Sequence, residues 1–136
     1  SLKTWMVRVL SAVAPGVGAL TLPASAISRD PAVVSAYLQD PLVYRGSIPA
    51  RTLAELLGAM NSLAARAAQL RVPVLVQHGT ADSLVPYDAN RPLYAALGQP
   101  KARTIRTYDG LFHEIYNEPE RDRVIADLEG WLATQG

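Results

Sequence analysis

Residues 72–86 read VPVLVQHGTADSLVP, and this stretch decides the fold. It begins as a nearly continuous apolar run of β-branched character and changes at His78-Gly79 to small and polar residues. A short run of this kind is typical of a strand that is buried on both faces of a parallel sheet. Asp82 therefore follows directly after the carboxyl end of a predicted strand.

Helical and strand patterns alternate around this stretch. Apolar stripes predict one helix over 53–70 and another over 86–97. A more polar edge strand is predicted over 102–108, followed by a turn at Asp109-Gly110 and by a final helix that Asn117 caps. Because helices and strands alternate, the predicted fold class is α/β with a parallel sheet.

Residues 1–50 are organised differently. Apolar residues recur at helical spacing near the N-terminus, and Pro15-Gly16 ends this first predicted helix near Ala14. Asp30-Pro31 predicts the start of a second, short helix, because the carboxylate can cap free amides and proline fits the first helical position. Residues 42–50 are predicted to be irregular. The region therefore reads as a helical insertion rather than as part of the sheet core.

The composition excludes several classes of protein. The 136 residues are 49% hydrophobic and 18% charged, with a formal net charge of +1. No basic stripe recurs along a predicted helix, so we expect no nucleic-acid partner. The absence of cysteine and the presence of only two histidines exclude a disulfide scaffold and argue against a metal site. The uncharged stretch 9–27 imitates a signal peptide, but proline and glycine interrupt it, so it predicts no membrane-spanning helix.

Two polar segments follow the two predicted strands. Sites of α/β sheets form where parallel strands end, so we expect Asp82 and His113 to project from neighbouring strand ends. A carboxylate there can accept the Nδ1 proton of the imidazole, which leaves Nε2 free to take a proton from a nucleophile. The spacing alone leaves two local alternatives open. Asp82 could serve only nearby backbone amides in an Asx turn, and His113 could bond only to a carbonyl.

Other titratable residues near these segments are expected to be structural. His78 is expected to stabilise the exit of the first strand. Glu114, Glu118 and Glu120 could compete with Asp82 for His113. Glu118 and Glu120, however, are placed in the first turn of the last predicted helix, where the helix dipole favours negative charge.

The segment 71–132 resembles the C-terminal part of α/β-hydrolases of the monoacylglycerol lipase and lysophospholipase group. The similar pieces are VPVLVQHGTADSLVP at 72–86 and YDGLFHEIYNEPERDRV at 108–124. In addition, SRDPAVVSAYLQDPLVYRG at 28–46 is similar to the cap region of that group. The resemblance implies the last two parallel strands of the α/β-hydrolase fold with their flanking helices, preceded by a helical cap.

The same resemblance implies roles for particular residues. Asp82 is the implied acid and His113 the implied base of a serine-hydrolase triad. Residues 1–50 are the implied mobile cap, or lid, over an acyl-binding pocket, and residues 51–136 are the implied C-terminal portion of the core. Leu84 and Val85 follow the acid and are expected to line the pocket.

One departure from this group matters more than the matches. Its nucleophile lies on a strand-to-helix elbow of pattern G-x-S-x-G, which no serine here fits. Ser47 follows Gly46, but Ile48 and Pro49 come next and no helix-starting elbow can form. We therefore expect the nucleophile and the oxyanion hole on a missing N-terminal half that ends just before Ser1, and we expect this chain alone to be inactive.

The chain is predicted to supply part of the active site of an enzyme that hydrolyses a small lipid ester, without a metal or organic cofactor. An isolated two-stranded core should leave an apolar face uncovered, so we expect association with the missing half or with a second copy. Two alternatives remain: a non-catalytic binding or assembly module, and a dehalogenase or epoxide hydrolase with aspartate at the elbow. Localisation does not follow from the residues. A cytoplasmic location is favoured, with transient contact of the cap with a lipid surface as a further expectation.

Overall fold

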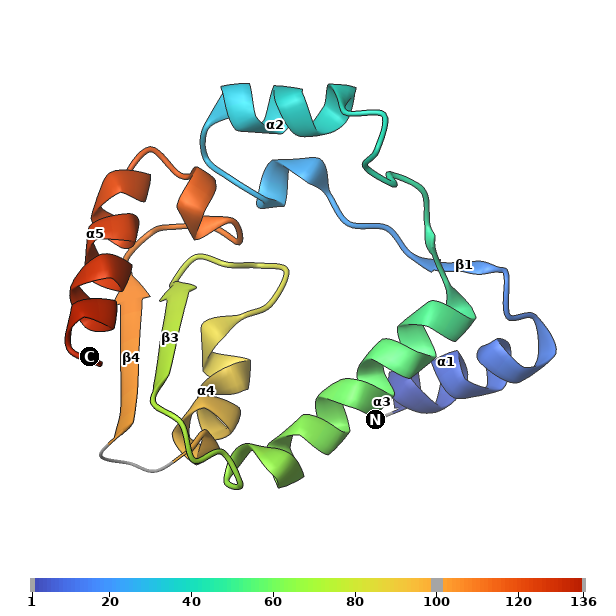
Figure 1. The fold of residues 1–136 in the computed structure, drawn as a ribbon. Coiled ribbons are helices and arrows are strands. Elements are labelled where there is room, and N and C mark those ends of the chain that lie inside the picture. The colour runs from blue at the N-terminus through green and yellow to red at the C-terminus, as the bar shows by residue number, and fades with distance from the viewer. Residues whose placement is uncertain (1, 99–101, 136) are drawn as a thin grey trace.

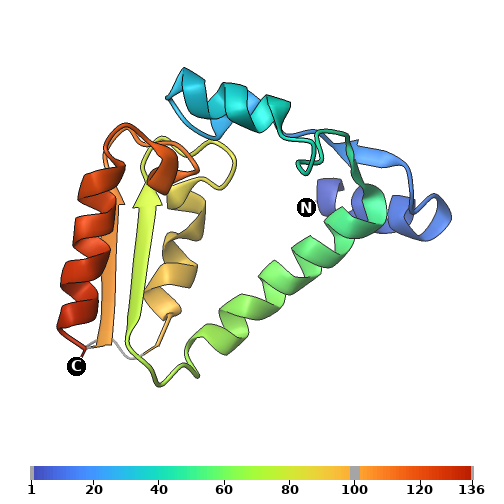
Figure 2. The same cartoon turned by 45° about the horizontal axis from the view of Figure 1, so that its top comes forward.

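The computed structural model describes residues 2–98 and 102–135. Its α/β part holds two parallel strands, β3 (Val74–Gly79) and β4 (Arg103–Tyr108), joined through helix α4 (Tyr87–Ala96). Helix α5 (Arg121–Ala133) follows β4, and Figures 1 and 2 show α4 and α5 on either side of the strand pair. This part of the structure agrees with the α/β class and the alternation that the sequence predicts.

The register of the two strands determines where the loops meet. Val74 pairs with Arg103 at one end of the strands, and Gly79 pairs with Tyr108 at the other. Both strands therefore end at the same edge, and the loops that follow them start side by side. A small core lies beneath this edge and consists of Tyr108, Leu111, Ile115 and Val124.

The remaining elements form a helical part that curves away from the strands. Helix α1 (Leu2–Val13) packs against α3 (Ala50–Ala67), and helix α2 (Pro31–Gln39) with the 3-10 helix η1 (Ala24–Ala26) spans the space to the α/β part (Figure 1). At its other end α3 is tied to the segment after α4, where the Gly98 amide donates to the Ala67 carbonyl over 2.9 Å. The helical part is thus attached to the α/β part near both α2 and the end of α3.

The predicted capping of the second helix is confirmed. Asp30 Oδ1 accepts a hydrogen bond from the Ala32 amide at 2.8 Å, with Pro31 at the first helical position. Residues 42–50, predicted to be irregular, contain the short strand β2 (Ile48–Pro49), which pairs antiparallel with β1 (Gly18–Leu20). Strands this short carry too little periodicity to be recognised from sequence.

The last helix was predicted to be capped by Asn117, and this is wrong. Asn117 ends a 3-10 helix, η3 (Ile115–Asn117), and α5 begins only at Arg121. The reason is Pro119, because a residue before proline is driven out of the helical region. Glu118 accordingly has φ −84° and ψ 161°. Glu118 therefore does not lie in the first turn of the last helix.

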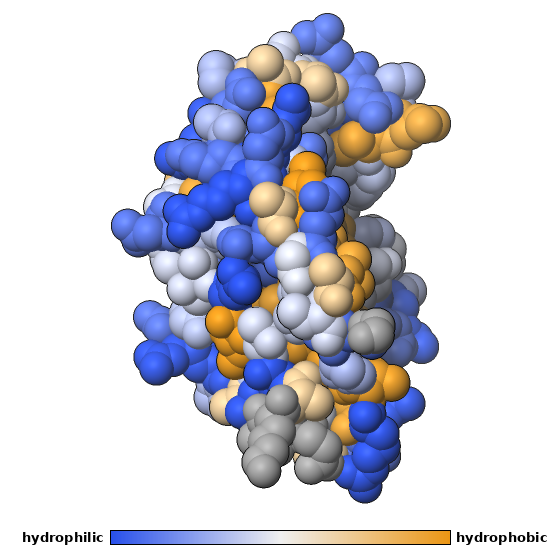
Figure 3. Space-filling view, turned by 60° about the vertical axis from the view of Figure 1, so that its left-hand side comes forward, coloured by the Kyte–Doolittle hydropathy of each residue, from blue (hydrophilic) through white to orange (hydrophobic). Residues whose placement is uncertain are grey.

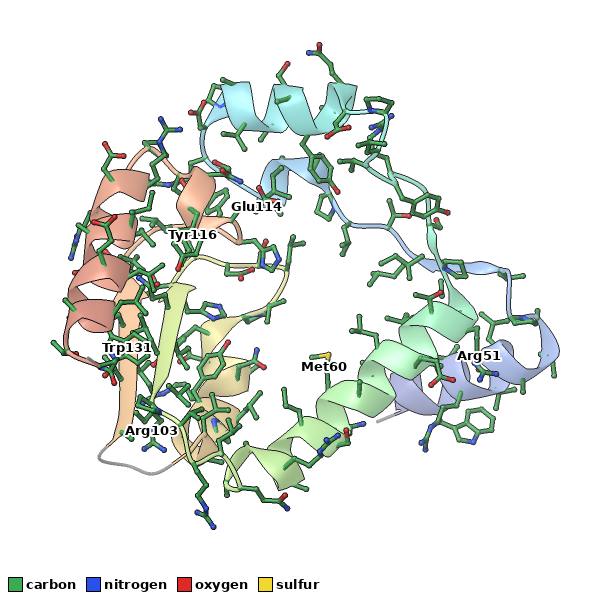
Figure 4. All side chains as sticks on the ribbon, in the orientation of Figure 1. Arg51, Met60, Arg103, Glu114, Tyr116 and Trp131 are labelled. Carbon is green, nitrogen blue, oxygen red and sulfur yellow. The ribbon has the colours of Figure 1, made fainter. Side chains whose placement is uncertain are left out.

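The first strand was expected to be buried on both faces, but in the described residues Val74 to Gln77 are only half-buried. Apolar side chains of the helical part are also exposed, and Met60 points from α3 toward the open centre in Figure 4. Figure 3 shows further hydrophobic patches between hydrophilic ones on the side of the molecule that carries α5. The described part of the chain thus leaves apolar surface in contact with water.

No helix in the described ranges has the length and apolarity needed to cross a membrane.

Candidate active site

Gly79 brings the two strand-end loops into contact. A Cβ at this position would lie 2.2 Å from the Leu111 carbonyl oxygen and 2.5 Å from that of Phe112. Only glycine leaves room for this approach, because both neighbours are backbone atoms. The Ala81 amide then donates to the Leu111 carbonyl over 3.0 Å. The loop that carries Asp82 is therefore attached to the loop that carries His113.

The Asp82 side chain is 4% exposed, and both of its carboxylate oxygens are engaged. Oδ1 accepts hydrogen bonds from the amides of Leu84 at 2.9 Å and Val85 at 2.8 Å. Oδ2 lies 2.8 Å from Nδ1 of His113. The local Asx role and the pairing with histidine, which the sequence offered as alternatives, coexist in one side chain.

The charge of Asp82 follows from its surroundings. Burial by itself raises the pKa of this carboxyl, but hydrogen bonds from the Val85 amide and from His113 outweigh it, so the pKa lies below its usual value. Asp82 is consequently ionised at neutral pH and can only accept. His113 therefore carries its proton on Nδ1, and Nε2 has a free lone pair.

His78 lies on the other side of the same carboxylate. The Tyr94 hydroxyl is 2.7 Å from Nδ1 of His78, and Nε2 is 2.8 Å from the Val85 carbonyl oxygen. Because the carbonyl can only accept, Nε2 donates and Nδ1 accepts from the tyrosine. These bonds hold the 82–85 turn against the end of β3 and fit the expected structural role of His78.

The phenol of Tyr94 belongs to the same cluster. Burial, followed by the negative charge of Asp82, raises the pKa of its phenol. The hydroxyl therefore keeps its proton at neutral pH and remains a donor to His78.

The other carboxylates near His113 have different partners. Glu114 Oε2 accepts from the Asn117 side-chain amide at 2.8 Å. Glu118 is 1% exposed and binds Arg29 and the Phe112 amide. Glu120 is exposed and also pairs with Arg29. Among these acidic residues, Asp82 is the one that binds the imidazole.

Asp82 and His113 border a cleft of about 420 Å³. Val85 lines this cleft together with Tyr94, whereas Leu84 contributes its amide to Asp82. Tyr116, labelled in Figure 4 beside the strand ends, also lines it and donates to Gln77 Oε1. A larger groove of about 790 Å³ lies between α1, β1 and α3, apart from the imidazole, and is mainly apolar.

The residues described contain no group of three or more His, Cys, Asp or Glu side chains that could hold a metal ion. Asp82 and His113 offer the cleft a buried carboxylate and a half-exposed imidazole whose Nε2 can take up a proton.

Comparison with known proteins identifies the family. Residues 1–120 match the family described as serine aminopeptidase, S33. The chain belongs to this family. The match covers both the helical part and the strand-end loops, so the two parts of the structure are parts of one family fold.

Several of the similar proteins carry lipase names. The chain is 40% identical, over 93% of its length, to the monoacylglycerol lipase of Mycolicibacterium smegmatis, and 27% identical to the human monoglyceride lipase over 96%. In structure it is similar to the monoacylglycerol lipase of Paleococcus ferrophilus, with a TM-score of 0.86 and 29% identity over 100% of the chain. The resemblance to the monoacylglycerol lipase group and the α/β-hydrolase fold is thus confirmed.

The extent of these matches is as informative as their names. The chain covers 45% of the Mycolicibacterium smegmatis protein, 44% of the human protein and 53% of the Paleococcus ferrophilus structure. It therefore spans about half the length of its family relatives.

Sequence reasoning missed two features of the site. The Tyr94–His78 bond could not be foreseen, because a tyrosine inside a helical stripe looks like any core residue. The role of Glu118 was missed because the helix start was placed too early; the Pro119 signal was present in the sequence.

Proposed function

We propose that this chain is the part of a serine ester hydrolase that supplies the acid Asp82 and the base His113. The nucleophilic serine and the oxyanion hole then belong to a segment outside the chain, N-terminal to it. The observation that carries the proposal is the 2.8 Å contact between His113 Nδ1 and Asp82 Oδ2 at the edge of the cleft. It leaves Nε2 as the proton acceptor that a serine hydroxyl needs.

The proposed reaction has two halves with the same proton path. The serine oxygen attacks the ester carbonyl while His113 Nε2 accepts the hydroxyl proton. Asp82 stabilises the imidazolium, which then protonates the leaving alcohol. Water next attacks the acyl-enzyme, again with His113 as base and then as acid, and the carboxylic acid is released. The proposed reaction consumes one water molecule and needs no metal or organic cofactor.

The proposed substrate is a monoacylglycerol or a similar single-chain lipid ester. The lipase names of the relatives support this class, as does the mainly apolar groove between α1 and α3. Residues 1–50 are the proposed cap and residues 51–136 the proposed core portion. Leu84 and Val85 are the proposed pocket residues beside the acid.

The exposed apolar surface supports a further part of the proposal, namely that the chain works in association with the N-terminal segment. The half-buried strand β3 and the exposed residues of α3 supply a surface for it to cover. Light scattering on the chain alone and after mixing with the separately produced upstream segment tests this. A monodisperse monomer that binds no upstream segment would contradict it.

The decisive test is hydrolysis of monoacylglycerols by the protein that contains this chain together with its natural upstream segment. His113→Ala is expected to lower kcat by about 10⁶-fold and Asp82→Asn by about 10⁴-fold. Asp88→Ala is the matched control, because this aspartate is 87% exposed on α4 and should leave kcat unchanged.

Three results would decide against the proposal. Near-normal activity of His113→Ala would show that His113 is not the base. Hydrolysis of epoxides or haloalkanes instead of esters would assign the other chemistry. Binding of a protein partner without any hydrolysis would assign a non-catalytic module. The chain without the upstream segment is expected to hydrolyse nothing.

A further inference from the structure

Glu118 is a buried carboxylate that takes no part in the proposed reaction. Its side chain is fully buried, although it follows a surface loop, and Pro119 keeps it outside α5. Burying a charge is unfavourable unless hydrogen bonds and an opposite charge compensate. The compensation here comes from two segments that are far apart in the sequence.

One set of bonds reaches the residue beside the base. Glu118 Oε1 accepts from the Phe112 amide at 2.9 Å, and Phe112 directly precedes His113. The bond holds the peptide unit between Leu111 and Phe112, one residue ahead of the histidine's own amide. The direction of the imidazole toward Asp82 depends on the course of this backbone.

The other set of bonds reaches the segment that leads into α2. Oε1 also accepts from the Arg29 amide at 3.2 Å, and Oε2 accepts from Arg29 Nε at 2.9 Å. Neighbouring bonds support the contact, since the Glu114 amide donates to the Ile27 carbonyl over 2.7 Å and Ser28 Oγ donates to the Asn117 carbonyl over 2.9 Å. Segment 27–29 and the loop 112–118 are therefore attached to each other through several bonds, with Glu118 bonded to both.

We propose that Glu118 is a positioning residue, whose carboxylate orients the backbone that leads into His113 and fastens segment 27–29 of the cap to the same loop. The proposal rests on the proposed function only for the reaction that the orientation serves. The bond between His113 and Asp82 that it explains is a property of the folded protein, with or without substrate. Cap attachment and base geometry then depend on one buried group.

Two substitutions separate the parts of this role. Glu118→Ala removes the acceptor for all three donors. In Glu118→Gln the amide oxygen can still accept from the amides of Phe112 and Arg29, while its NH₂ group faces the Arg29 guanidinium, which is also a donor. The glutamine variant therefore keeps the orientation of His113 and loses the side-chain attachment of Arg29.

The test uses the protein that contains this chain and its upstream segment, with two readouts. The first is kcat on a soluble short-chain ester. The second is the proton NMR resonance of His113 Nδ1–H, which reports its hydrogen bond to Asp82 whether or not the protein turns over. Glu120→Gln is the matched control, because Glu120 also pairs with Arg29 but is exposed at the surface.

Glu118→Ala is expected to lower kcat by about 10- to 100-fold and to broaden or remove the His113 resonance. Glu118→Gln is expected to keep the resonance and to restore most of kcat. Glu120→Gln should stay within about twofold of the wild type, since exposed ion pairs contribute little.

A folded Glu118→Ala variant with the wild-type resonance and kcat would overturn the proposal. If the alanine variant does not fold, the glutamine variant decides, and loss of the resonance in a folded Glu118→Gln protein would overturn it as well. Failure of the proposed function looks different. In that case the wild type hydrolyses no ester, while the effect of Glu118 on the resonance can still be measured.

Discussion

The strand-end loops and the α1–α3 helix pair satisfy their side chains in opposite ways. At the strand ends His78, Asp82 and Glu118 are buried, and their side chains are hydrogen-bonded within the chain. In the helix pair Trp5 is 62% exposed and Met6 is 56% exposed. In one region the buried polar side chains have hydrogen-bond partners, whereas in the other large apolar side chains face water.

The difference separates two kinds of stability. Buried polar networks are specific, because a lost partner leaves an unpaired group in a site without water. Exposed apolar surface selects its partners weakly, because covering it with any apolar surface lowers the free energy of the system. Substitutions that remove or add single atoms in the strand-end loops should therefore change stability strongly. The stability of the helix pair should depend mainly on whether another apolar surface covers it.

The largest expected effect comes from a pair of glycines, one in each region. Gly79→Ala should lower the free energy of unfolding by about 3 kcal/mol, because its Cβ would overlap two backbone carbonyls. Gly58→Ala lies in open space on α3 and should raise it by about 0.5–1 kcal/mol, since alanine is the better helix former. Urea denaturation of the wild type and the two variants measures both changes in the free energy of unfolding. Equal effects of the two substitutions would contradict the difference between the strand-end loops and the helix pair.

The pH dependence of stability should be smaller and confined to the strand-end loops. The pKa of Asp82 is lowered in the folded protein, so its ionised form stabilises the fold. This contribution is complete above the pKa of about 3.9 that an aspartate has in an unfolded chain, and is lost as the pH falls through the lower folded value. The free energy of unfolding, measured by urea denaturation at several pH values, should therefore fall more steeply from neutral to acidic pH for the wild type than for Asp82→Asn. Parallel curves would show that Asp82 gains nothing from its partners.

The smallest effect on folding is expected in the helix pair. Trp5→Ser should change the free energy of unfolding by no more than about 0.5 kcal/mol, because the side chain is already exposed. If the cap contacts lipid, the same substitution should weaken co-sedimentation with phosphatidylcholine vesicles. Leu132→Ser is the control, since Leu132 on α5 is 54% exposed but lies outside the helix pair. Equal loss of vesicle binding in both variants would remove the special role of the cap.

The sequence predicted elements best where local chemistry decides the outcome. The β-branched run before His78 and the Asp30-Pro31 start of α2 contain their own signals, and both elements form. The placement of Asp82 and His113 on neighbouring strand ends followed from topology alone, because parallel strands of one register end together. Their roles in a reaction stay a prediction.

The remaining features depend on contacts that no local pattern records. The β1–β2 pair is held by residues some thirty positions apart and is too short for periodicity. The bonds from Arg29 to Glu118 join segments separated by 89 positions. Only the expulsion of Glu118 from the last helix was readable in advance, from the proline that follows it.

The attachment of α3 to Gly98 has a mechanical consequence when it is taken together with the bonds at Arg29. The helical part is attached to the α/β part at two places, one at the end of α3 and the other just before α2. A displacement of segment 27–29 that keeps the Arg29–Glu118 bonds must carry Glu118 with it, and Glu118 also binds the Phe112 amide beside His113.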